Sequence, residues 1–260
     1  MKVGVIFAAY NCADTLTQSL APWLTARALK MDGHSFVIAA VSVPFTGFDN
    51  GPVDPATHHV LAKALEAGEI DHLILGDQPV EETEARGEAL KRLVADGVEV
   101  SWLVDADEIY ALDEISRVFT FIASRPLVTA FRGSLKNYVG IAGDSKTYIA
   151  KPFTPMRGHR THIAGGYVAA GFWDDNNVVY CRPWVPEDCV RDTSLSCITI
   201  PKTIQFTPHY SWPASERSRR KIAYQNARPG WLCDFAWDDS RGGLIWRDGV
   251  VVPETARDPE

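Results

Sequence analysis

The chain lacks any long apolar run. In its 260 residues no segment approaches the roughly 20 consecutive apolar residues that a membrane-spanning helix needs. The first apolar stretch, Val3 to Ala9, is also too short for the hydrophobic region of a secretory signal peptide followed by a cleavage site. We therefore interpret this stretch as a strand and expect a cytoplasmic protein with no membrane segment.

Paired cysteines and an excess of positive charge are lacking as well. The five cysteines are scattered and form no Cys-x-x-Cys motif, which argues against a zinc ribbon or a disulfide scaffold and favours free thiols. Lys and Arg total 26 against 33 Asp and Glu, a formal net charge of −7. That balance does not favour nucleic-acid binding through the whole surface but allows a local basic patch.

Strand and helix patterns alternate through residues 1–125. Short apolar runs predict strands at Val3–Ala9, Phe36–Val43, Asp71–Leu75 and Val98–Val104. Apolar residues at helical spacing predict helices at Thr15–Leu29, Thr57–Ala67, Glu81–Ala95 and Asp113–Ser124. Such alternation predicts an α/β fold with a mainly parallel sheet between helices, in which ligands bind beyond the carboxyl ends of the strands.

Residues 126–260 have a different character. Pro126 to Val139 predicts a strand or hairpin, and the chain then stays rich in glycine, proline and aromatic residues to about residue 210, with short strand-like pieces and no clear helix. A basic helix is expected at Ser215–Gln225. We interpret this half as a loop- and strand-rich elaboration that completes an acceptor site on residues 1–125, within the same domain.

Three carboxylates follow the fourth predicted strand in the run Asp105-Ala106-Asp107-Glu108. Asp105 and Asp107 are two residues apart, so in extended backbone they point the same way. Converging carboxylates repel each other unless a cation lies between them, and Mg²⁺ or Mn²⁺ takes such oxygen ligands and bridges them to phosphates. Acidic residues also commonly start turns or cap helices after strands, so a purely structural interpretation stays open.

The order of these motifs resembles that of family 2 glycosyltransferases. Val-Gly-Val-Ile-Phe-Ala-Ala-Tyr-Asn at 3–11 is similar to the family's nucleotide-binding strand, which commonly ends in Tyr-Asn. Ala85-Arg86, a helix, and the strand that ends in Asp105-Ala106-Asp107-Glu108 resemble the family's Ala-Arg-Asn, helix, strand and Asp-x-Asp-Glu. The resemblance covers roughly the first 120 residues. It implies the GT-A fold, a nucleotide-sugar donor and a divalent cation, Mn²⁺ or Mg²⁺.

The resemblance also implies roles for individual residues. The donor, by the family's default a UDP-sugar, would be bound by Ala9, Tyr10, Asn11, Arg86, Asp105 and Ala106. Asp105 and Asp107 would contact the metal and the donor ribose, with His209 as a further metal ligand. His159 and His162 compete with His209, but we expect both in a polar loop.

Two candidates have a simpler alternative. Arg86 either pairs with a glutamate of its own helix, Glu82 or Glu84, or helps to hold the acidic loop or a phosphate. Glu187 and Asp188 resemble the family's later Glu-Asp pair, whose carboxylate is the general base of inverting members. A turn after Pro186 would account for these two acidic residues equally well. Other candidates for the general base are Asp192, Asp174 and Asp175.

The chain departs from the family pattern at two places. Gly87 stands where the family usually has Asn, and the second strand ends in Val-Ser-Val-Pro-Phe at 41–45 rather than in an Asp–Ser-type turn that helps to read the base or ribose. The identity of the donor base therefore stays open, as does the acceptor, a saccharide or a modified nucleic acid among the options. Four basic residues lie close together in the sequence: Arg217, Arg219, Arg220 and Lys221. They could form a lid over the diphosphate, a patch that binds an anionic acceptor such as DNA, or a helix face exposed to solvent.

Two other functions compete with glycosyl transfer. A nucleotidyltransferase on a related fold normally carries a glycine-rich loop with Arg or Lys after its first strand, and Ala8-Ala9-Tyr10-Asn11 is no such loop. A non-catalytic module that binds a nucleotide or sugar would have no need for both Asp105 and Asp107. The sequence thus predicts a metal-dependent, inverting hexosyl- or pentosyltransferase.

Overall fold

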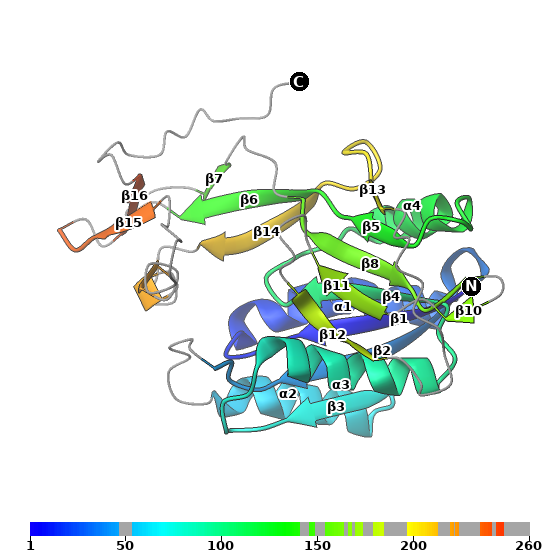
Figure 1. The fold of residues 1–260 in the computed structure, drawn as a ribbon. Coiled ribbons are helices and arrows are strands. Elements are labelled where there is room, and N and C mark those ends of the chain that lie inside the picture. Colours follow the sequence, from blue (N-terminus) through cyan, green and yellow to red (C-terminus); the bar gives the residue numbers. More distant parts are fainter. Residues whose placement is uncertain are drawn as a thin grey trace.

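The computed structural model describes residues 1–46, 54–140, 146–148, 154–163, 166–167, 170–173, 179–184, 197–212, 219–220, 222–223, 235–240 and 243–246. Its centre is a seven-stranded sheet (Figure 1). In spatial order the strands are β13 (Cys197–Thr199), β5 (Ala130–Arg132), β8 (Met156–Arg160), β4 (Val100–Asp105), β1 (Lys2–Ala8), β2 (Ser35–Ser42) and β3 (His72–Leu75). All neighbouring pairs are parallel except the two that β8 makes with β4 and β5. This is the mainly parallel, helix-flanked α/β sheet that the sequence predicts.

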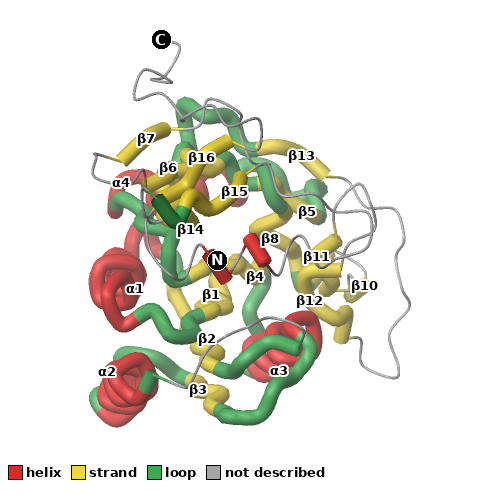
Figure 2. Tube along the Cα trace, turned by 90° about the vertical axis from the view of Figure 1, so that its left-hand side faces the viewer, coloured by secondary structure: helices red, strands yellow, loops and turns green. Residues whose placement is uncertain are grey.

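Helices cover both faces of the sheet. Helices α1 (Ala13–Leu29), α2 (Pro55–Glu66) and α4 (Leu112–Ala123) lie on one face, and α3 (Glu82–Ala95) lies on the other (Figure 2). A short 3₁₀ turn, Met31–Gly33, follows α1. Every predicted helix of the first half is present, with ends that differ by no more than a turn from those expected. Among the described residues no helix is long and apolar enough to cross a membrane.

Alternation along β1 divides the core into two clusters. Val3, Val5 and Phe7 point toward α1 and α4, whereas Ile6 points toward α3. Gly4 shares the α3 face, where a Cβ atom would lie 3.0 Å from Leu93 Cδ1. The absence of a side chain at this position therefore lets α3 approach the sheet closely.

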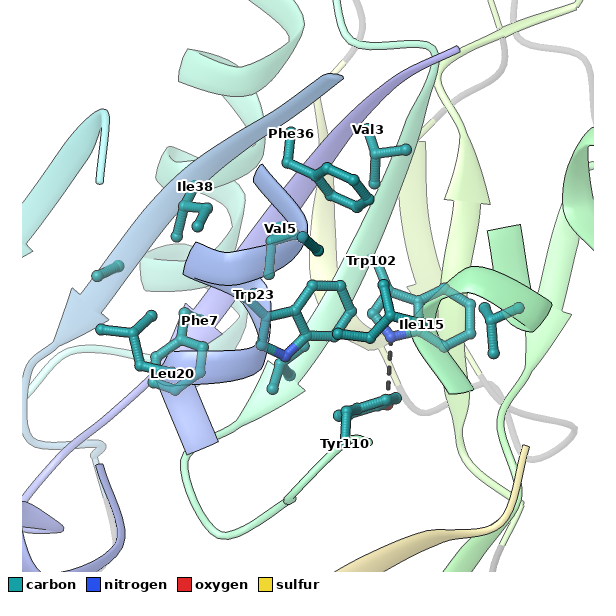
Figure 3. Packing of buried hydrophobic residues seen from close by; sticks show 14 of the residues in the cluster. Val3, Val5, Phe7, Leu20, Trp23, Phe36, Ile38, Trp102, Tyr110 and Ile115 are labelled. Atoms are coloured by element: carbon teal, nitrogen blue, oxygen red, sulfur yellow. Dashed lines mark hydrogen bonds between the residues drawn. The ribbon is translucent and has the colours of Figure 1, made fainter. Parts of the chain in front are cut away.

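Aromatic rings fill the cluster beneath α1 and α4 (Figure 3). Trp23 and Tyr110 meet edge to face with ring centroids 5.0 Å apart, and Trp102 meets Phe119 in the same way at 5.7 Å. Trp102 Nε1 also donates a hydrogen bond of 3.1 Å to the Tyr110 hydroxyl. The cluster thus gives β4 and the segment after it a rigid base.

The second half contributes strands to the same sheet and several smaller ones. Strand β14 (Thr207–Trp212) pairs in parallel with β6 (Leu135–Gly140), which pairs antiparallel with β7 (Lys146–Tyr148). Three antiparallel pairs complete the description: β9 (His162–Ile163) with β10 (Gly166–Tyr167), β11 (Ala170–Trp173) with β12 (Val179–Trp184), and β15 (Phe235–Asp238) with β16 (Gly243–Trp246). Of the expected basic helix, only residues 219, 220, 222 and 223 are described, and these are helical.

One expectation about this half was wrong. The segment around Arg157 to His162 is not a polar loop, because residues 156–160 form strand β8 inside the main sheet. His159 is 1% exposed and its Nδ1 lies 2.7 Å from the Arg160 carbonyl oxygen. Burial lowers the pKa of His159 to about 4, so this histidine is neutral and structural.

Candidate functional site

The site lies at the carboxyl edge of the sheet, where β1 and β4 end side by side. Ala8 is in register with Asp105, and the Ala106 amide donates a hydrogen bond of 2.9 Å to the Ala8 carbonyl. Ala9 follows directly, 2% exposed, with its amide bonded to the Val41 carbonyl of β2 at 2.8 Å. The segments at 9–11 and 105–108 therefore leave the sheet next to each other, as ligand-binding segments of parallel sheets do.

Tyr10 and Asn11 form the turn after β1. Asn11 has a left-handed backbone, φ +49°, which asparagine tolerates better than most residues. Its side-chain oxygen accepts a hydrogen bond of 2.7 Å from the Asp54 amide, and Asp54 in turn caps the start of α2. Tyr10 is partly exposed, and burial, with a smaller contribution from the negative charge of Asp77, raises the pKa of its hydroxyl. The turn is thus fixed between two strand ends and a helix start.

Two arginines hold the carboxylate of Asp105. Arg86 Nη2 lies 2.9 Å from Asp105 Oδ1, and Arg157 Nη2 lies 2.9 Å from Asp105 Oδ2. Both guanidinium groups are buried, while the Asp105 side chain is 27% exposed. Partial burial acts to raise the pKa of Asp105, but the two positive charges outweigh it and hold that pKa below its usual value. Asp105 is therefore a fixed anion.

Arg86 has both of the roles considered for it. Its Nη1 lies 2.6 Å from Glu82 Oε1 one turn earlier in α3, and its Nη2 reaches Asp105. The guanidinium carbon also lies 5.9 Å from the ring centre of Phe45, which follows β2. The start of α3 thus faces the acidic segment, and Arg86 links the two.

Glu108 is completely buried beneath this segment. Its Oε1 contacts the Arg157 guanidinium, and its Oε2 accepts a hydrogen bond of 3.3 Å from the Tyr110 hydroxyl. Burial raises the pKa of Glu108 to about 8, with help from the charges of Asp105 and Asp107 and against the opposing effect of Arg157. Glu108 is a buried anchor of the segment, since its side chain has no exposure to a ligand.

Asp107 lies beside His209, which comes from β14. Asp107 Oδ1 is 3.4 Å from His209 Nε2, and the two side chains are only 6% and 9% exposed. The backbone holds them together: the Tyr210 amide donates to the Asp107 carbonyl at 2.8 Å, and the Ile109 amide to the Pro208 carbonyl at 2.9 Å. Residues about 100 positions apart in sequence thus form one carboxylate–imidazole pair.

The donor set of this pair suits a divalent cation. Two ligands about 2.1 Å from one ion and at roughly 90–110° to each other lie about 3.0–3.4 Å apart, which matches the Asp107–His209 separation of 3.4 Å. A carboxylate and an imidazole are both acceptable to Mn²⁺. No group of three or more His, Cys, Asp or Glu side chains in the described part of the chain is arranged to hold a metal. A cation at this site would therefore need further oxygen ligands from substrate and water.

Sequence reasoning missed Arg157. The residue sits in Met-Arg-Gly-His-Arg, whose polar letters resemble a surface loop, yet its side chain is only 3% exposed. The one available signal was its position between the predicted hairpin and the later strands, next to Gly158. The structure brings it to the two carboxylates at either end of the acidic segment.

Several candidates lie outside the described residues. These are the predicted general bases Glu187 and Asp188, the alternatives Asp192, Asp174 and Asp175, and the basic residues Arg217 and Lys221. Arg219 is described and lies 3.4 Å from Asp239. The structure thus describes the residues predicted to bind the donor and the metal, and the general base stays a prediction.

Comparisons with known proteins give matches among solved structures alone. No protein-family model matches the chain, and neither does any curated protein. The crystal structure of S. aureus TarS 1–349 is similar over 88% of this chain and 66% of that chain, at 16% identity and a TM-score of 0.41. The same TarS segment in complex with UDP-GlcNAc matches over 56% of this chain and 36% of its own, at 19% identity and a TM-score of 0.35.

A third match is the mannosyltransferase PcManGT from Pyrobaculum calidifontis in complex with GDP-Man and Mn²⁺. It covers 61% of this chain and 44% of its own length, at 20% identity and a TM-score of 0.35. The chain thus spans well under two thirds of the UDP-GlcNAc complex and of the mannosyltransferase. At such identities and TM-scores, these matches specify neither a substrate nor an activity for this chain.

Proposed function

We propose that this chain is a metal-dependent glycosyltransferase that moves a sugar from a nucleoside-diphosphate sugar to an acceptor hydroxyl. The observation that carries the proposal is the Asp107–His209 pair, 3.4 Å apart at the carboxyl edge of the sheet, beside an Asp105 held by two arginines. A carboxylate–imidazole pair next to a fixed anion at the end of a parallel sheet suits a cation with a phosphorylated ligand.

In this proposal Asp107 and His209 hold Mn²⁺ or Mg²⁺. Such an ion would neutralise the charge that develops on the departing nucleoside diphosphate. Each carboxylate oxygen of Asp105 is paired with an arginine. Each oxygen still has a second lone pair, which can accept a hydrogen bond from a hydroxyl group of the nucleotide sugar. We assign Asp105 mainly to the donor ribose, with Ala9, Tyr10, Asn11 and Ala106 lining the same edge.

The acceptor half of the reaction rests on the sequence. The acceptor hydroxyl must lose its proton as it attacks the anomeric carbon, which requires a general base. We propose Glu187 or Asp188 for this role, and inversion at the anomeric carbon follows if one of them acts directly on the acceptor. The proposal specifies neither the nucleobase of the sugar donor nor the chemical class of the acceptor.

Ligand-induced stabilisation tests the donor and metal site. We expect a nucleoside diphosphate to raise the Tm of the chain only when Mn²⁺ is also present. The underlying gain in unfolding free energy is about 2.7 kcal/mol at a hundredfold excess of ligand over Kd. The nucleotides to compare are UDP, GDP, ADP and CDP. The Asp107→Asn variant should lose the shift and the metal-dependent turnover of nucleotide sugars. Asp113→Asn, an exposed acid of α4, is the matched control and should keep both.

The outcomes separate the competing functions. Stabilisation that needs nucleotide and Mn²⁺ together, with loss in Asp107→Asn, supports the transferase. Nucleotide binding that is indifferent to Mn²⁺ and to Asp107 would favour a non-catalytic binding module. Release of pyrophosphate from a nucleoside triphosphate would point to the nucleotidyltransferase instead.

A further inference from the structure

Arg157 occupies an irregular position in β8. Ala130 and Phe131 of β5 pair with His159 and Gly158, but the next residue of β5, Arg132, pairs with Met156 and skips Arg157. Arg157 is therefore the extra residue of a β-bulge, a device that re-aims a side chain and is common beside active sites.

The two core clusters show the effect of the bulge. Gly158 lies against Trp102, which belongs to the cluster under α1 and α4, while Met156 belongs to the cluster under α3. Residues two apart in a regular strand would share one face. A Cβ atom on Gly158 would lie 2.6 Å from the Trp102 ring, so the glycine lets the ring approach the backbone closely next to Arg157.

The Arg157 guanidinium closes the turn that carries Asp107. The Glu108 amide donates to the Asp105 carbonyl at 2.9 Å, which makes residues 105–108 a four-residue turn. A single nitrogen, Arg157 Nη2, reaches the side chains of both the first and the last residue of this turn. Asp107 is the third residue, and its carboxylate is left facing His209.

We propose that Arg157 is a positioning residue that sets the Asp105–Glu108 turn so that Asp107 and His209 can share one cation. The inference rests on the proposed function, since it concerns the cation of that site. Arginine suits the task because its planar group can contact two carboxylates at once from a fixed direction. Groups that orient metal ligands without touching the metal typically change metal affinity about 10- to 100-fold when removed.

The test is Mn²⁺ binding to the full chain, with and without UDP, measured from the loss of the free-ion signal in electron paramagnetic resonance. We expect Arg157→Gln to raise the Kd for Mn²⁺ by about 10- to 100-fold. It should also remove the nitrogen coupling that the His209 ring gives to the bound ion. The control is Arg160→Gln on the same strand: Arg160 is buried and donates to the carbonyls of Val128 and Ile122, at 2.9 and 2.7 Å.

A second variant separates positioning from folding. Arg157→Gln leaves Glu108 buried without its cationic neighbour, which on its own destabilises the protein. The double variant Arg157→Gln, Glu108→Gln removes that cost and leaves two amides that can hydrogen-bond to each other. We expect it to recover most of the unfolding midpoint while Mn²⁺ binding stays weakened.

The results distinguish this inference from the proposed function. Weakened Mn²⁺ binding in both Arg157 variants, with normal binding in Arg160→Gln, supports the positioning role. Wild-type Mn²⁺ affinity in the double variant would overturn it, because the arginine would then serve only as the buried partner of Glu108. If the wild-type chain bound no Mn²⁺ in the presence of any of the nucleoside diphosphates, the proposed metal site itself would be wrong.

Discussion

At the scale of single residues, the surroundings shift the pKa values of two carboxyl groups in one turn in opposite directions. Burial and two neighbouring acids raise the pKa of Glu108, whereas Arg157 and Arg86 overcome the effect of burial and lower the pKa of Asp105. The lowered pKa means that Asp105 contributes stability above its unfolded pKa and loses that contribution as the pH falls through its folded pKa. Glu108 has the reverse dependence, and that dependence is open to measurement.

We expect the free energy of unfolding to fall with rising pH because of Glu108. Between its ordinary pKa of 4.5 and its folded pKa of about 8, the unfolded chain releases a proton that the folded chain retains. Stability then decreases relative to a Glu108→Gln variant by up to about 1.4 kcal/mol per pH unit, and the difference levels off above that range. Urea unfolding of both proteins from about pH 5 to 9 measures this difference. Curves that stay parallel across the range would contradict it.

At the scale of elements, the position of His209 depends on a carboxylate in α4. Glu114 Oε1 accepts hydrogen bonds from the Phe206 amide at 2.7 Å and from the Thr207 hydroxyl at 3.0 Å, where β14 begins. Its other oxygen accepts from the Ala111 amide at 3.3 Å. Glu114 therefore joins the start of α4 to the start of β14, two residues before His209.

Glu114→Ala should release the start of β14. Loss of the acceptor leaves the Phe206 amide and the Thr207 hydroxyl without this partner, at a cost of about 1–3 kcal/mol in unfolding free energy. Mn²⁺ affinity should fall as well, because His209 follows on the same strand. Glu114→Gln keeps an acceptor oxygen and is the matched control. Equal stability and Mn²⁺ affinity in the two variants would show that this anchor is dispensable.

At the scale of the whole molecule, the site joins parts of the chain that the sequence did not bring together. The strands β1 and β4 were predictable because they are short apolar runs covered on both faces. Strand β8 was not, because a bulge interrupts its alternation and its arginines and histidine have buried partners that the sequence does not show. His209 entered through a family resemblance, while its anchor Glu114 gave no signal at all.

A fragment of residues 1–125 should therefore not fold as a unit. In the full chain β8 pairs with β4, and Gly158 lies against Trp102. Without residues 126–260 the edge of β4 would expose unpaired backbone groups and a large part of the aromatic cluster. We expect the fragment to show no cooperative urea transition and a weak near-ultraviolet circular dichroism signal, in contrast to the full chain. A sigmoidal transition with native-like aromatic signals would contradict this expectation.

The bulge at Arg157 also makes chain length itself a determinant of the site. Along β8, the alternation of side chains between the two faces of the sheet shifts by one residue at Arg157. A chain one residue shorter here would pair with β5 without interruption, and Met156 would stay on its present face, opposite to that of Gly158. No residue would then be left between them to direct a side chain toward Asp105 and Glu108. What the site requires at position 157 is thus an added residue as much as an arginine.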